Sequence, residues 1–238
     1  RSAWTSGAVL LMLFALPLIF MLIKTQREPQ TSDFEAKNQE VRSWTRAEVL
    51  RDPLFWFLVV GILSPAFIGT TVFFHQVYLV ELRGWSLTVF ASAFSIMATT
   101  TICFTLIAGA LVDKYSAKAL VPAFLIPLSL CCFVLAIFTA QWSAFVFMAL
   151  MGVSYGFSST LFGALWPEIY GTKHLGSIRA IVVAVMVFGT AAGPGLTGWL
   201  IDLGVHYPSQ IFAMGIYCVF ATGLMIFVSR RLIARSKV

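Results

Sequence analysis

Long apolar stretches separated by short polar connectors recur along the chain. Seven of them reach the roughly 20 apolar residues that a helix needs to cross a bilayer. They cover residues 4–23, 54–77, 87–112, 119–140, 144–166, 180–201 and 210–229. A backbone in lipid must satisfy its own hydrogen bonds, and no segment shows the alternating polarity of barrel strands. The pattern therefore predicts an all-α, polytopic membrane helix bundle with seven spans.

Basic residues lie at the ends of these stretches and give the bundle a direction. Fourteen of the sixteen Lys and Arg fall in residues 24–52, in every second connector after it and in the tail, whereas Arg1 and Arg83 fall on the other side. Cytoplasmic loops carry an excess of Lys and Arg. We therefore expect a protein of the cytoplasmic membrane with its C-terminus inside and its N-terminus outside. An outward N-terminus without an export signal predicts further spans upstream.

Composition excludes several classes of protein. Charged residues make up 11% of the chain and hydrophobic ones 59%, with a mean hydropathy of +0.90. A soluble domain has about 25% charged residues, and a disordered chain has more charge and less apolar surface. The net charge of +6 follows membrane topology, so we expect no nucleic-acid partner. The sequence contains no phosphate-binding loop or metal-ligand cluster, and we expect no catalytic residue, metal or cofactor.

The connector at residues 24–52 is the longest and carries six basic and six acidic residues. Thr45 and Glu48 have the spacing of a capping box, which predicts a short surface helix, and Asp52-Pro53 predicts the start of the next span. A plain tether and a regulatory docking segment both fit this linker. The predicted units are a membrane helix at 1–23, the cytoplasmic linker at 24–52, a six-helix transmembrane bundle at 53–229 and a basic cytoplasmic tail at 230–238.

Polar side chains gather in four of the spans, 54–77, 87–112, 144–166 and 180–201. Polar groups inside a membrane face protein or water, although Ser and Thr also bond to their own helix or to a neighbouring one. A cavity lined by these spans would be centred near the membrane midplane, where an aromatic hydroxyl suits a small polar or organic solute. The residues expected there are Ser64, Thr99, Tyr155, Ser158 and Thr190.

Two further sets of residues have candidate roles. His75, with its neighbour Gln76, lies near the outer end of its span, and its imidazole is suited to proton coupling or to a bonded interfacial position. Two G-x-x-x-G patterns predict close helix packing, and the proline predicts a bend or a break. These positions are Gly152, Gly156, Gly189, Gly193 and Pro194.

The run GALVDKYSAK from Gly109 to Lys118 resembles the G-x-x-x-D-[RK]-x-G-[RK]-[RK] turn of the major facilitator superfamily, from which Ser116 and Ala117 depart. The segment from Glu168 to Arg179 resembles the acidic residue and arginine around a later cytoplasmic turn of that family. The resemblance implies helices six to twelve of a twelve-helix fold, in which 1–23 ends the N-terminal bundle and 24–52 is the central linker. It also implies a secondary active transporter of a small organic solute that works by alternating access.

The same resemblance implies a cytoplasmic gate. The charges at the inner ends of the spans would hold that face shut when the outer side is open, and a change of pairing would shift a two-state equilibrium. Snorkelling at the interface is the alternative role. The gate residues are Asp113, Lys114, Glu168 and Arg179.

The turns also resemble those of bacterial monocarboxylate and oxalate carriers. Those carriers are expected to hold an anion with a basic residue at mid-depth, and this sequence has none there. An anionic substrate would therefore need a charge from the N-terminal half. A seven-span receptor is the alternative function, but the motifs of rhodopsin-like receptors in the last span and outer loops are absent. A membrane-embedded enzyme would need paired carboxylates or a His cluster at depth, which the sequence lacks.

Overall fold

The computed structural model describes residues 5, 6, 9, 11–23 and 42–235. The chain forms two compact units, Arg1–Lys37 and Asn38–Val238. In the first, a short π-helix, η1 (Leu11–Ala15), continues into α2 (Leu16–Ile23). This apolar helix covers the later part of the first predicted span. Residues 24–41 of the predicted linker and the last three residues of the tail lie outside the described residues.

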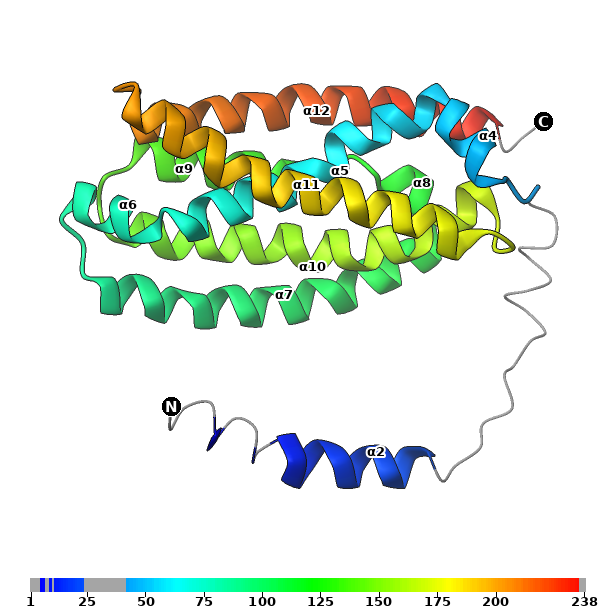
Figure 1. The fold of residues 1–238 in the computed structure, drawn as a ribbon, viewed down its shortest axis with the longest axis horizontal. Coiled ribbons are helices and arrows are strands. Elements are labelled where there is room, and N and C mark those ends of the chain that lie inside the picture. The colour runs from blue at the N-terminus through cyan, green and yellow to red at the C-terminus, as the bar shows by residue number, and fades with distance from the viewer. Residues whose placement is uncertain (1–4, 7–8, 10, 24–41, 236–238) are drawn as a thin grey trace. The chain divides into compact units, whose positions relative to one another are not determined.

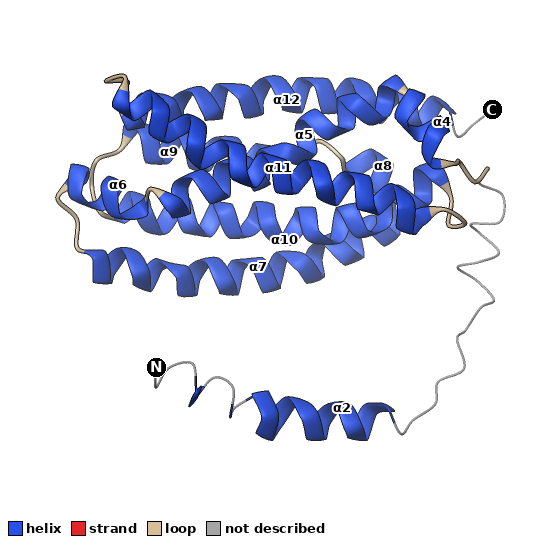
Figure 2. Cartoon of the chain, viewed as in Figure 1, coloured by secondary structure: helices blue, strands red, loops and turns tan. Residues whose placement is uncertain are grey.

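The second unit is a bundle of helices, and residues 42–235 include no strand (Figures 1 and 2). Six helical segments in it are long and apolar enough to cross a membrane, the segment Ala117–Ile137 among them. The all-α membrane bundle predicted from the sequence is confirmed. Its helices are α4 (Arg46–Arg51), α5 (Pro53–Phe74), α6 (Gln76–Arg83), α7 (Leu87–Tyr115), α8 (Ala117–Leu120), α9 (Leu125–Ile137), α10 (Trp142–Tyr170), α11 (Leu175–Asp202) and α12 (Tyr207–Arg235).

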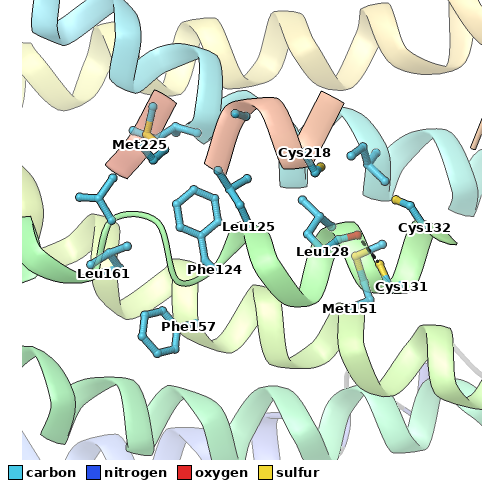
Figure 3. Packing of buried hydrophobic residues seen from close by; sticks show 14 of the residues in the cluster. Phe124, Leu125, Leu128, Cys131, Cys132, Met151, Phe157, Leu161, Cys218 and Met225 are labelled. Carbon is cyan, nitrogen blue, oxygen red and sulfur yellow. Dashed lines mark hydrogen bonds between the residues drawn. The ribbon is translucent and has the colours of Figure 1, made fainter. Parts of the chain in front are cut away.

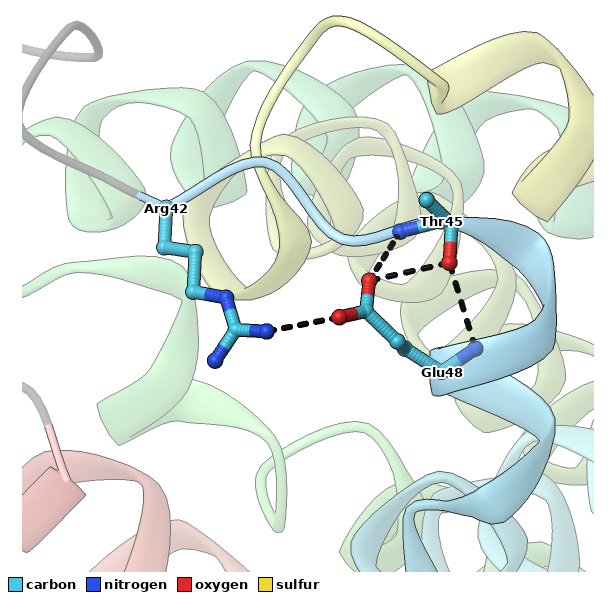
Figure 4. Close-up of polar contacts among 3 residues, drawn as sticks. All are labelled: Arg42, Thr45 and Glu48. Atoms are coloured by element: carbon cyan, nitrogen blue, oxygen red, sulfur yellow. Dashed lines mark hydrogen bonds and ion pairs between the residues drawn. The ribbon is translucent and has the colours of Figure 1, made fainter.

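Local signals in the sequence explain how the bundle begins. The Thr45 hydroxyl accepts from the Glu48 amide, while the Glu48 carboxylate accepts from the Thr45 amide at 2.7 Å and completes a capping box (Figure 4). The other Glu48 oxygen lies 2.6 Å from Arg42 Nη2. Asp52 then caps α5 by accepting from the Leu54 amide at 3.1 Å, and Pro53 takes the first helical position.

Two spans are interrupted where the sequence predicts continuous helices. The predicted span 54–77 ends at Phe74, because His75 leaves the helical conformation with φ −92° and ψ 17°. A separate helix, α6, follows. The predicted span 119–140 divides into α8 and α9 around a turn that contains Pro122, whose ring removes a helical N–H donor. By contrast, α11 runs through Pro194 as one helix.

The helices pack as a chain of neighbours, in which α7 lies against α10, α10 against α9, α9 against α12, and α5 between α12 and α11. The core where α9, α10 and α12 meet is mostly apolar (Figure 3). Phe124, Leu128, Met151 and Cys218 are fully buried there. The helices least covered by the rest of the described chain are α7 and α11.

Glycines set two of these contacts. A Cβ at Gly152 or Gly156 would collide with the α7 backbone, and one at Gly193 would collide with Thr71 and the α5 backbone. Gly189 faces the Leu63 side chain on α5. The helices approach so closely because these positions carry no side chain, as in membrane packing of small residues.

Candidate functional site

The end of the bundle where α5 begins and α10 and α12 end carries a buried carboxylate, and we call it the charged end. Arg235 Nη1 lies 2.8 Å from Asp52 Oδ2, and the Tyr170 hydroxyl donates to the same oxygen at 3.1 Å. The Asp52 side chain is only 6% exposed. Three helices that are distant in sequence therefore share one charge-assisted contact.

The last residues of the linker pack onto this contact. The Trp44 amide donates to the Tyr170 carbonyl at 2.9 Å, and the Trp44 ring meets the Tyr170 ring edge-on. The Arg235 guanidinium lies 4.1 Å from the centroid of the Trp44 ring, a cation–π contact. Trp44 thus joins the linker to the ends of α10 and α12.

A second ionic contact at the charged end joins α10 to α8. One Glu168 carboxylate oxygen accepts from the Ala117 amide at 2.8 Å, and the other lies 3.7 Å from Lys118 Nζ. Ala117 is the first residue of α8, so the carboxylate also meets the positive end of a helix. This contact fixes the turn after α7 to the end of α10.

The opposite end of the bundle relies on contacts from side chains to backbone. Arg83 Nη2 donates to the Leu135 and Ala136 carbonyls at 3.0 and 3.2 Å, where α9 ends. Burial lowers the pKa of the Arg83 guanidinium, but an arginine keeps its charge in proteins. Trp85 Nε1 donates to the Thr139 carbonyl at 2.8 Å. A cation thus caps the negative end of α9.

A cavity of about 570 Å³ lies between α5, α11 and α12. Its walls are mostly apolar, with Phe67, Phe188 and Met214 among them. Polar side chains contribute at a few points, which are Ser64, Thr197, Ser209, Gln210 and Tyr217.

Comparison with known families decides what this bundle is. The family model of the Major Facilitator Superfamily matches residues 1–178 and, in a second match, residues 77–237. The chain belongs to the major facilitator superfamily. A search of curated proteins finds no match. The facilitator is therefore an integral membrane protein and a membrane transporter, and members of its family are not enzymes.

The facilitator places its predicted gate residues in different surroundings. Glu168 lies against Lys118 and the start of α8, as described above. Arg179 Nη2 donates to the Gly163 carbonyl on α10 at 2.7 Å. Asp113 and Lys114 are exposed at the end of α7, where Lys114 Nζ lies 5.1 Å from the Tyr115 ring centroid. The four residues thus share one end of the bundle without forming one cluster.

The predicted cavity residues are also spread over the facilitator. Ser64 lines the cavity between α5, α11 and α12. Tyr155 donates to the Pro65 carbonyl at 3.1 Å, and Ser158 donates to the Tyr155 carbonyl within α10. Thr99 is exposed on α7, and Thr190 is half-buried on α11, and each donates to its own helix.

His75 and Gln76 lie half-buried at the opposite end, where α5 gives way to α6. His75 Nδ1 is 3.1 Å from the Thr71 carbonyl, and its ring centroid is 5.6 Å from that of Tyr207. No group of three or more His, Cys, Asp or Glu that could hold a metal ion occurs in the described part of the facilitator.

The sequence does not predict that Asp52, Tyr170 and Arg235 meet. It predicts Asp52 as a helix cap and Arg235 as part of a basic tail. A signal was available, since a carboxylate beside the membrane together with a basic helix terminus calls for a partner. Nothing in the sequence, however, identifies which helix ends meet.

Proposed function

We propose that this facilitator is a secondary active transporter that moves a small organic solute by alternating access, driven by an ion or proton gradient. The observation that carries the proposal is the position of the ionic contacts. Every ion pair among the described residues lies at the charged end or in the linker next to it. Contacts of this kind can break and form again with another partner, as a two-state gate requires.

The gate comprises Asp113, Lys114, Glu168 and Arg179, and we propose that the charged end faces the cytoplasm. In the structure, the Glu168 carboxylate holds the start of α8 against the end of α10. Asp113 and Lys114 are exposed at the end of α7, so they are open to partners from a second bundle. The excess of basic residues at this end supports the orientation and a cytoplasmic-membrane location.

The solute path runs along the helices that carry the predicted polar residues. α7 and α11, which present Thr99 and Thr190, are the least covered helices. Tyr155 and Ser158 belong to α10, which packs against α7, and Ser64 belongs to α5, which packs against α11. We propose that an N-terminal bundle of the same protein covers this face and supplies the other half of the solute site, and that His75 and Gln76 serve coupling.

Uptake by the full-length protein in liposomes tests this proposal. A panel of labelled small organic acids, amines and neutral solutes would be offered under an imposed proton or sodium gradient. We expect saturable uptake of one class that stops when an ionophore dissipates the gradient. Uptake that persists unchanged after dissipation would show a uniporter instead. Uptake of none of these solutes by a correctly inserted protein would contradict the transport of a small organic solute.

The gate has its own test. Asp113→Asn should slow uptake about tenfold, equivalent to roughly 1.4 kcal/mol in the rate-limiting barrier, while membrane insertion stays intact. Asp202→Asn, an exposed carboxylate at the other end of the bundle, is the matched control. Wild-type uptake by Asp113→Asn would remove this residue from the gate. Exchanging the charges of Glu168 and Lys118 should restore part of the activity that Glu168→Lys loses.

A further inference from the structure

A groove of about 390 Å³ lies at the charged end, where the short helix α4 meets α11. Arg46 of α4 belongs to its wall and is the one charged residue among the described residues that line it. The other lining residues are apolar and all come from α11, and they are Ala180, Ile181, Ala184, Val185 and Phe188. A single cation therefore stands beside an apolar groove.

The guanidinium of Arg46 is available to a ligand. Arg46 is exposed, and it takes part in no ion pair among the described residues. Glu48, on the same helix, is already bonded to Arg42 and to the Thr45 amide. The planar guanidinium of an arginine matches the geometry of a phosphate, to which it can donate two parallel hydrogen bonds. The groove thus offers an open cation to an anionic group.

Arg46 lies at the depth of the membrane surface. α4 ends at Arg51, and the span α5 begins two residues later at Pro53. In the first turn of this span, Trp56 is 47% exposed and donates from its indole to the Leu50 carbonyl at 2.9 Å. Exposed tryptophans of this kind collect at the membrane interface. From Ala180 to Phe188 the groove then follows α11 for about 12 Å, away from the charged end and towards the middle of the membrane.

The groove and the proposed solute path use different faces of α11. Ala180, Ala184 and Phe188 are four residues apart in turn, so they share one face of the helix. Thr190, which belongs to the proposed solute path, lies about 120° around the helix from Ala184. An N-terminal bundle that covers the Thr190 face therefore leaves this groove to the lipid.

We propose that the groove binds one anionic phospholipid, with its phosphate on the Arg46 guanidinium and an acyl chain along Ala180, Ala184 and Phe188. Charge complementarity selects this occupant, because basic pockets beside membrane helices attract anionic headgroups, whereas the apolar wall alone would accept the chain of any lipid. The inference does not rest on the proposed transport function, since lipid binding is measured without a solute or a gradient.

Photolabelling of the full-length protein in phosphatidylcholine nanodiscs tests the site. The probe is a phosphatidylglycerol that carries a diazirine in one acyl chain. We expect a label on the segment of α11 from Ala180 to Phe188, and about fivefold less of it in Arg46→Gln. Arg51→Gln removes an exposed arginine of the same helix that lies outside the groove, and it should leave the labelling unchanged. Equal labelling of the wild type and Arg46→Gln would overturn the proposal.

A second probe separates the headgroup from the chain. Phosphatidylcholine with the same diazirine should label α11 less, and to the same extent in the wild type and in Arg46→Gln. The ratio of the two probes within one variant does not depend on how much of that variant is folded. A ratio that Arg46→Gln leaves unchanged would refute a phosphate on Arg46. Displacement of the first probe by soluble glycerol phosphate would show a site for a free anion and overturn the lipid assignment.

A pair of substitutions tests the path of the chain. Ala184→Phe fills the groove and should lower the labelling by both probes. Val183→Phe adds the same ring at an exposed neighbour outside the groove and should leave the labelling unchanged. Equal labelling of these two variants would contradict an acyl chain in the groove.

Discussion

The two ends of the bundle are held in different ways. At the charged end, side chains of opposite charge meet between helix ends, with Asp52 against Arg235 and Glu168 against Lys118. At the opposite end, Arg83 and Trp85 donate to backbone carbonyls. A carbonyl at a helix end is fixed by the backbone, whereas a charged side chain can turn to a new partner. The contacts of the charged end can therefore exchange partners in the proposed transport cycle, whereas those of the opposite end, which we call the anchor, stay with one helix end.

Removal of the Asp52 carboxylate should break the charged end most severely. Asp52→Ala is expected to lower the free energy of unfolding by about 2–3 kcal/mol, because it removes both a buried ion pair and a helix cap. Asp52→Asn, which keeps a cap acceptor, should recover about 1 kcal/mol of this loss. Detergent-induced unfolding followed by circular dichroism measures both. The exposed Asp202→Ala is the control, and an equal loss there would contradict the assignment.

Loss of the Arg83 contacts at the opposite end should lower the free energy of unfolding by less. The size of this loss should not depend on salt. Arg83→Met removes two charge-assisted donors from the end of α9 and should cost about 1.5 kcal/mol. The same unfolding assay, run at low and high ionic strength, measures the loss. Arg83→Lys keeps the charge and should retain part of the stability. A loss that disappears in high salt would show that the anchor resembles the ionic contacts.

High salt should weaken the Glu168–Lys118 contact, which is the longer of the two ion pairs at the charged end. At 3.7 Å and with partly exposed partners, Glu168–Lys118 should lose about 0.5 kcal/mol as ionic strength rises to 1 M. Lys118→Met, with no charge to screen, should lack this component of the salt dependence. If the wild type and Lys118→Met respond alike, the pair adds nothing to stability.

The smallest expected effect lies in the capping box beside the charged end. The backbone hydrogen bond from Thr45, its hydroxyl and Arg42 hold the pKa of Glu48 below its usual value of 4.5. The contribution of the ionised carboxylate is complete above the unfolded pKa and is lost as the pH falls through the lowered folded pKa. The protection factors of the amides in residues 44–52, which correct for the intrinsic pH dependence of exchange, should therefore fall below about pH 4.5. Thr45→Ala should make this loss smaller and complete at a higher pH, and an unchanged pH profile would contradict the cap.

Local and global features of the fold differ in how far the sequence predicts them. The capping box at Thr45 and the start of α5 at Asp52 follow from residues two or three apart, so their geometry is set by the helix itself. Hydropathy does not predict the break at His75, because a single non-helical residue hardly changes the average over an apolar stretch. The break around Pro122 had a visible proline, but hydropathy alone continues through it.

The contacts of the site depend on distant pairings. Asp52 and Arg235 are 183 residues apart, and Glu168 and Ala117 are 51 apart. The sequence places these charges at one end of the membrane but does not state which helix ends become neighbours. It also does not reveal the groove beside Arg46, because that groove forms only where α4 packs against α11.

Gly171 lets the end of the linker pack closely against the end of α10. Its φ of +78° turns the chain after α10, and a Cβ there would strike Ser43. Trp44, the next residue, is bonded to the Tyr170 backbone and covered by Arg235. A pull on the linker is therefore delivered to the tips of α10 and α12 as well as to α5. If the proposed gate is correct, tension in the linker would act on three helices at once.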